Sequence, residues 1–311
     1  MVISLRRRDL GALFGPAHPG IVLDVAAPPR SALAVQVAPP DLLRVCQSGS
    51  TLISARVDGV SGAHWLRHRH PDPVVAPIGV ALAEQLGPDL MRWAHHFATE
   101  LASGVQGPLR RGRWILRPVT VRGCAGGGGG TSAAAGSAVA HWRPDVGGFD
   151  EEGYLDWRAD HADPLLPLRR PSPPDAARVK AFTKLARAGL LPPVLIWQVT
   201  GLRCWLVIDG HDRLTAAVNA GIVPPVLGLA TMGRRDEWAQ RWYRQKIETV
   251  AAQGRLNAGA TEALGAELAE RQIRAYLDSG FTPADPIPDG AAERHRQARD
   301  RMRSRPPARP V

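Results

Sequence analysis

Apolar residues in the C-terminal half of the chain repeat first with a helical spacing and then in continuous runs. The helical stripe consists of Val179, Phe182, Leu185 and Ala186. Ser172, followed by Pro173 and Asp175, predicts the N-cap of this helix. Gly189 predicts its left-handed end. The stripe therefore predicts an amphipathic helix between Pro173 and Gly189.

The runs that follow predict strands, because they are short, apolar and bounded by turn residues. They are Pro193–Val199, Arg203–Asp209 and Val223–Leu229, with a tight connection at Thr200–Leu202. Between the last two runs, His211–Ala220 predicts a second short helix that ends at Gly221. The order helix, strand, strand, glycine turn, helix, strand predicts an α+β fold for this region.

The N-terminal third carries similar signals. Short β-branched or alternating segments predict strands at Ile21–Val25, Ala32–Ala38, Leu52–Val57 and Trp114–Val121. Ile78–Ser103 has apolar residues at helical spacing, and Gly87-Pro88 divides it into two predicted helices. We therefore expect a separate mixed α/β region of unknown type here.

A glycine-rich stretch separates the two regions. The run Gly126–Gly130, followed by Thr, Ser and Ala, buries little and predicts a flexible linker. The acidic segment Asp145–Trp157 predicts a solvated lead-in. The expected division is residues 1–122 as the mixed α/β region, 123–140 as the linker, 141–230 as the α+β domain, 231–282 as a helical extension, and 283–311 as a disordered tail.

Composition excludes several classes of protein. With 311 residues, 44% of them hydrophobic and 22% charged, the chain is unlike a disordered chain, a coiled coil or a collagen-like fibre. Its longest apolar runs, such as Leu190–Val199, are far shorter than a membrane span, so we expect no membrane partner. The three scattered cysteines predict no disulfide framework. Because Pro16 and polar residues follow Arg6–Arg8, we expect no export signal and a cytoplasmic protein.

Basic charge is concentrated near the C-terminus. The net charge is +10, and residues 291–311 contain seven arginines. Candidate contacts to DNA or RNA are Arg294, Arg296, Arg299 and Arg301. Trp238 and Trp242, interleaved with arginines, are also suited to stacking bases. A solvated chain end and a stripe that packs on a neighbouring domain are the alternatives, and both stay open.

A histidine cluster in the N-terminal region suggests metal ligands, namely His64, His68 and His70. However, Arg67 and Arg69 lie between these histidines and would repel a cation, and no glutamate or cysteine completes a known spacing. We therefore expect a polar surface loop here and no metal site.

The junction between the second predicted strand and the second helix carries the clearest candidate chemistry. Gly210 lets the backbone turn sharply, and the residues after it supply the N–H groups of a helix start, which favour an anion. Arg213 is suited to a bidentate contact with phosphate oxygens, and His211 donates or accepts at neutral pH. The alternative is structural: Asp209 or Asp212 caps the helix, and Arg213 pairs with them on the surface.

Several sequence phrases around this turn occur in a fixed order. They are Gly189–Pro192, Ile208–Leu214, Ala216-Ala217, Gly221 and Val223–Val226. In this order they resemble the ParB/sulfiredoxin superfamily. Its pattern is a helix ending in Gly-Leu-Leu-x-Pro, a strand, an Asp-Gly-x-x-Arg turn, an alanine-rich helix and a Val-Pro-x-Val strand. Asp163–Arg170 fits the opening strand of that fold, so the resemblance covers about residues 163–230.

The resemblance implies a small mixed sheet with helices and a nucleotide site. In that superfamily the Gly-x-x-Arg turn contacts the phosphates of a nucleoside triphosphate. Carried over to this chain, the phosphate-binding residues are Gly210, His211, Asp212 and Arg213. The resemblance also implies ATP or CTP with Mg²⁺ as the ligand, and hydrolysis of the nucleotide or transfer of its phosphate to a small molecule. His211 and Asp209 are then the catalytic candidates.

Departures from the family pattern narrow these options. Sulfiredoxins carry a cysteine where this chain has His211, and partition proteins carry Glu-Arg-Arg there with a helix-turn-helix downstream, which residues 234–280 do not show. The small-molecule kinases have a similar turn, but only Asp163 is a candidate for their catalytic acid. Three hypotheses stay open: a nucleotide-binding protein, a protein associated with DNA or RNA, and an inactive ParB-like scaffold. No oligomeric state is predicted.

Overall fold

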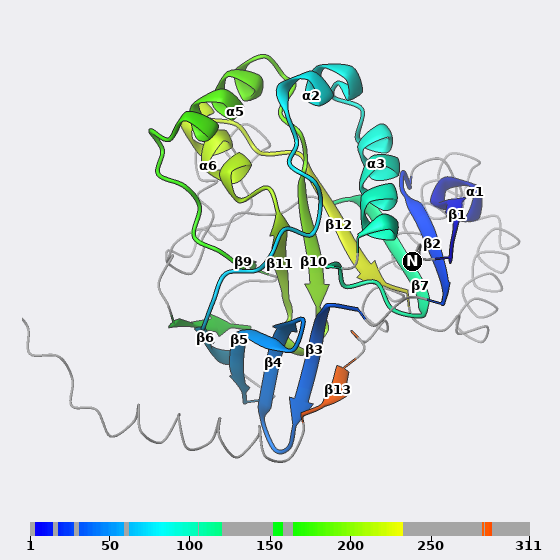
Figure 1. Cartoon of the computed structure of the whole chain (residues 1–311), viewed down its shortest axis with the longest axis vertical. Helices are drawn as coiled ribbons and strands as arrows, with labels where there is room; N and C mark the ends of the chain where they lie inside the picture. Colours follow the sequence, from blue (N-terminus) through cyan, green and yellow to red (C-terminus); the bar gives the residue numbers. More distant parts are fainter. Residues whose placement is uncertain are drawn as a thin grey trace, which may run out of the picture.

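The computed structural model describes residues 4–14, 18–27, 31–58, 62–104, 106–119, 152–157, 164–232, 282 and 284–287. Within these residues the chain has two mixed β-sheets and five α-helices (Figure 1). The predicted α+β class is therefore confirmed.

One sheet takes strands from both halves of the chain. Its strands lie in the order β1 (Ser4–Asp9), β2 (Ile21–Ala27), β7 (Gly112–Pro118), β12 (Val226–Thr231), β10 (Val194–Val199), β11 (Cys204–Asp209) and β9 (Leu165–Pro167). β7 and β12 are antiparallel neighbours, with Leu116 opposite Leu229. The expected separate N-terminal region is therefore wrong, because backbone hydrogen bonds continue from β7 into the C-terminal strands. The predicted linker, 123–140, lies outside the described residues.

The second sheet contains four strands that were not predicted from the sequence. Its order is β13 (Ala284–Pro286), β3 (Leu33–Ala38), β4 (Leu42–Gln47), β5 (Ser50–Val57), β6 (Gly62–Arg67) and β8 (Glu152–Asp156). The four are β4, β6, β8 and β13. All neighbours are antiparallel except β13 and β3. β8 lies within Asp145–Trp157, which was predicted as a solvated lead-in. The histidine-containing segment begins in β6 rather than in a loop, because residues 62–66 pair with β8 and residues 63–67 pair with β5.

A short piece of the expected disordered tail is ordered. Residues 284–286 form β13, and the next residue, Ile287, is buried. Arg110 donates two hydrogen bonds to the Asp285 carboxylate, at 2.9 and 2.6 Å. The expectation of disorder is therefore wrong for these residues, because strand pairing, an ion pair and a buried side chain hold them.

The helices lie beside the seven-stranded sheet. They are α1 (Leu10–Phe14), α2 (Val80–Leu86), α3 (Leu90–Ser103), α5 (Ala177–Arg187) and α6 (His211–Ala220), with a 3₁₀ turn, η1 (Thr200–Leu202). The predicted division between α2 and α3 is confirmed. Figure 1 shows α3 running along this sheet, and α5 packs against α6 at one end of it. Among the described residues, no helix is both long and apolar enough to cross a membrane.

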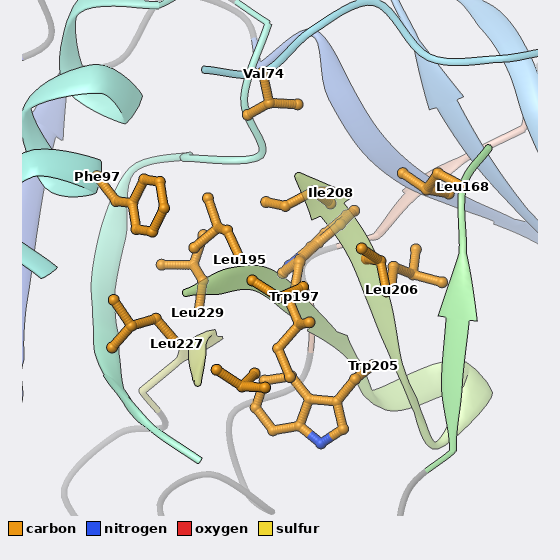
Figure 2. Packing of buried hydrophobic residues seen from close by; sticks show 14 of the residues in the cluster. Val74, Phe97, Leu168, Leu195, Trp197, Trp205, Leu206, Ile208, Leu227 and Leu229 are labelled. Carbon is orange, nitrogen blue, oxygen red and sulfur yellow. The ribbon is translucent and has the colours of Figure 1, made fainter. Parts of the chain in front are cut away.

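The central strands are buried on both faces. Every residue of β10 and β12 is buried, and Phe97 of α3 lies beside Leu195 and Leu229 (Figure 2). In β11, all residues are buried except Asp209, which is partly exposed at the strand's end. Asp209 therefore marks the point where the chain leaves the hydrophobic core.

The helix α5 begins later than its predicted N-cap. Its first residue is Ala177, and the preceding Ala176 makes no side-chain cap. The Ser172 N–H donates instead to Oδ1 of Asp212, at 2.9 Å. Ser172 is thus held by a carboxylate of α6 and does not cap α5. The left-handed end at Gly189, with φ of 71°, is confirmed.

Candidate anion-binding site

Gly210 joins β11 to α6 in a conformation that favours glycine. Its φ is 95° and its ψ is 22°, in the left-handed region. Its carbonyl oxygen accepts hydrogen bonds from the N–H groups of Arg213 and Leu214. A Cβ atom on Gly210 would lie 2.7 Å from both Nε and Nη2 of Arg213. Glycine is therefore needed here for the backbone turn and also for the space that the guanidinium occupies.

Arg213 is a buried cation with an unused donor. Its side chain is 2% exposed, and its Nη2 donates to the carboxylate of Asp209, which is 25% exposed. Its Nη1 has no hydrogen-bond partner among the described residues. Burial lowers the pKa of Arg213, and the Asp209 carboxylate opposes that shift. The turn therefore holds a positive charge that its protein partners do not fully use.

Asp212 is held as a carboxylate by several donors. Its Oδ1 accepts the Ser172 N–H, and its Oδ2 accepts from Nη2 of Arg169 at 3.3 Å and lies 3.6 Å from Nε of Arg178. Burial alone would raise the pKa of Asp212, but the Ser172 N–H and Arg169 outweigh it and lower the pKa. Asp212 therefore orients two arginines.

His211 is neutral and enclosed. It is almost fully buried, and its Nε2 accepts the Arg169 N–H at 3.3 Å. Burial, and next the charge of Arg169, lower its pKa well below the usual value, while Asp212 opposes them. An Nε2 that accepts leaves the ring proton on Nδ1. His211 thus fixes the backbone of Arg169.

Three arginines contact the aspartates of the turn directly, namely Arg169 after β9, Arg178 on α5 and Arg213 on α6. They exceed the two carboxylates of Asp209 and Asp212 in number. Arg169 and Arg178 are 33% and 52% exposed, so they form the accessible rim of this cluster. The arrangement is suited to binding an anion, because a helix start and guanidinium groups face the same turn.

The residues that the sequence predicted at the turn lie together. The alternative interpretation is that Asp209 or Asp212 caps the helix while Arg213 pairs with them on the surface, and the structure differs from it. Asp209 pairs with Arg213 as that alternative expects, yet Arg213 is buried rather than on the surface. The carboxylates of Asp209 and Asp212 accept from the Arg213 side chain and from the loop before α5, and α6 has no side-chain cap at its start.

Three arginines of the site were not predicted from the sequence, namely Arg67, Arg169 and Arg178. The pair Arg169-Arg170 ends the segment that was predicted as the opening strand, and that position was the available signal. Arg67 was noticed only as a residue that would repel a metal. The predicted nucleic-acid contacts lie outside the described residues, as do Asp163, Trp238 and Trp242; the contacts are Arg294, Arg296, Arg299 and Arg301.

Two histidines of the cluster, His64 and His68, contact residues of the six-stranded sheet. The His64 and Tyr154 rings lie 4.6 Å apart between centroids, and His68 Nε2 lies 2.7 Å from Ser54 Oγ. In the part of the chain that the structure describes, no three His, Cys, Asp or Glu residues are placed to hold a metal ion.

Comparisons with known proteins do not identify a family. The chain matches no protein-family model, no curated protein and no solved structure. The resemblance to the ParB/sulfiredoxin superfamily therefore stays a prediction.

Proposed function

We propose that this protein binds a nucleoside triphosphate, ATP or CTP, through phosphates held at the turn between β11 and α6. Arg213 carries the proposal: its buried guanidinium lies against Gly210 at a helix start, and its Nη1 has no partner among the described residues. Burying a charged donor without a full set of partners costs stability. A phosphate oxygen is an acceptor that would complete the set.

The phosphates approach this turn from the rim in the proposed complex. The side chains of Arg169 and Arg178 are partly exposed. Each contacts only Oδ2 of Asp212, at 3.3 and 3.6 Å, so both can turn toward a more highly charged anion. The helix start adds partial positive charge. Both carboxylates of the turn are engaged by cations, so a Mg²⁺ ion would be bound through phosphate oxygens and water.

The two catalytic candidates differ in access. His211 is enclosed and its Nε2 is occupied, so in this proposal it positions the Arg169 loop. Asp209 is 25% exposed, so its carboxylate is the more accessible of the two to a bound ligand. A role in hydrolysis or phosphate transfer therefore falls to Asp209 before His211.

Thermal unfolding with ATP, CTP, GTP and UTP, each with Mg²⁺, tests the proposal on the full chain. A ligand at 100 times its Kd adds about 2.7 kcal/mol of stability. We expect at least one nucleotide to raise the Tm, and Arg169→Gln to reduce that rise.

Arg187→Gln is the matched control, since Arg187 is an exposed arginine in the last turn of α5. It should leave the rise unchanged. A Tm that none of the four nucleotides moves would contradict the proposal.

A further inference from the structure

One arginine of the six-stranded sheet lies beside the strand that leads into the candidate site. Arg67 is the last residue of β6, and its Nη2 donates to the carbonyl oxygen of Pro167 at 2.7 Å. Pro167 is the last residue of β9, in the other sheet. The guanidinium also lies over the Trp65 ring, 5.4 Å from its centroid. Arg67 is therefore held where the ends of β6 and β9 meet.

The position of Arg67 brings its charge to the same histidine that contacts Arg169. Arg169 follows Pro167 by two residues and donates its N–H to His211. The charges of Arg169 and Arg67 both act on the pKa of His211 and lower it, after the larger effect of burial. Arg67 is thus electrostatically coupled to the start of α6, although β6 is far from α6 in the sequence.

Gathering like charges is unfavourable, and the fold does so here with residues of separate elements. Arg169, Arg178 and Arg213 already exceed the carboxylates of the turn, and Arg67 is held at Pro167, two residues before Arg169. A chain of several phosphate groups offers acceptors to cations that are spread over more than one element. A single small anion would reach fewer of them.

We infer that Arg67 is a further anion-binding residue of this site, and that the ligand is a polyphosphate whose phosphate chain contacts both sheets. The inference rests on the proposed function and extends the site to a residue of the second sheet. Binding then stabilises the contact between β6 and β9, because one ligand interacts with residues at both strand ends.

Titration of the full chain with inorganic tripolyphosphate and with inorganic phosphate tests this inference. We expect Arg67→Gln to weaken tripolyphosphate binding about tenfold, which corresponds to about 1.4 kcal/mol for one charge-assisted contact. Arg67→Lys keeps the charge and a donor for Pro167, so it should retain part of the affinity. Tripolyphosphate should bind more tightly than phosphate.

Arg69→Gln is the control, since Arg69 is an exposed arginine two residues further on. It should leave tripolyphosphate binding unchanged. A merely structural Arg67 would lower the Tm of the free protein without changing the Kd measured well below that Tm.

The outcomes separate the two proposals. If Arg67→Gln binds tripolyphosphate with wild-type affinity while Arg169→Gln does not, Arg67 is not part of the site, and the proposed function stands. If the wild-type chain binds neither tripolyphosphate nor any nucleotide, both proposals are wrong. Equal affinity for phosphate and tripolyphosphate would overturn the inferred ligand class alone.

Discussion

Two clusters of aspartate and arginine in this protein have similar ion pairs in very different surroundings. On the seven-stranded sheet, Asp24 of β2 pairs with Arg8 of β1 at 2.7 Å and with Arg113 of β7 at 2.8 Å. At the turn, Asp212 and Arg213 belong to one helix start. The Asp24 side chain is 30% exposed, whereas that of Asp212 is 4% exposed.

The difference lies in burial: the charges of the first cluster are exposed to solvent, and those of the second lie inside the fold. Asp24 lies between neighbouring strands, where solvent screens its ion pairs and each contributes at most about 1 kcal/mol. Arg213 is buried and has an unused donor, and a buried ion pair is a poor source of stability. In the proposed function, a bound anion supplies the missing partner of Arg213.

The largest effect on stability should come from truncation of the buried arginine. Arg213→Ala leaves a cavity, and we expect it to lower the free energy of unfolding by about 3 kcal/mol. Arg213→Met refills that space with an apolar chain, so it should stay within about 1 kcal/mol of the wild type. Urea unfolding checks both. Equal losses for the two variants would show that the charge itself stabilises the turn.

The glycines at the two ends of α6 provide the next comparison. Both are left-handed, with φ of 95° at Gly210 and 66° at Gly221. A Cβ on Gly210 would collide with Arg213, whereas one on Gly221 meets nothing within 4 Å. We expect Gly221→Ala to cost about 1 kcal/mol and Gly210→Ala about 2 kcal/mol or more. Urea unfolding of both variants measures this, and equal costs would refute the packing argument.

A smaller effect depends on pH. The folded-state pKa of His211 is lowered, so the unfolded chain binds its proton first as the pH falls below about 6.5. The contribution of His211 to stability is therefore full above pH 6.5 and is lost progressively below it. Between pH 7.5 and 5.5 we expect a loss of about 1 kcal/mol, measured by urea unfolding. His211→Gln should remove that part of the slope, and an unchanged slope would contradict it.

The smallest effect on stability should come from the exposed cluster of Asp24, Arg8 and Arg113. Asp24→Asn removes the charge that Arg8 and Arg113 share, yet we expect a change in unfolding free energy below about 1 kcal/mol. The difference from wild type should shrink further in high salt, because the cluster is solvent-exposed. A loss of 2 kcal/mol or more, or no dependence on salt, would show that this cluster resembles the buried one.

Local patterns predicted the elements that carry their own signal. The spacing around Phe182 and the glycines after α5 and α6 predicted these two helices and where they end, and the apolar runs predicted β10, β11 and β12. Five strands were not predicted from the sequence, namely β1, β4, β6, β8 and β13. β1 contains Arg6–Arg8 and β8 is acidic, so their strand state depends on distant partners rather than on their own composition.

The candidate site was predictable only in part, for the same reason. Gly210 to Arg213 occupy four consecutive positions at one strand end, and a turn of this type is visible in a single sequence. Arg67 and Arg178 reach the site because β6 meets β9 and α5 packs on α6. The late start of α5 likewise depends on Asp212, which takes the Ser172 N–H. Such contacts have no local signature.

Measuring stability and nucleotide affinity together for Arg213→Met is the decisive experiment. Our account predicts a variant that unfolds within about 1 kcal/mol of the wild type and binds the stabilising nucleotide at least about tenfold more weakly. A stable Arg213→Met protein that binds this nucleotide with wild-type affinity would contradict the account.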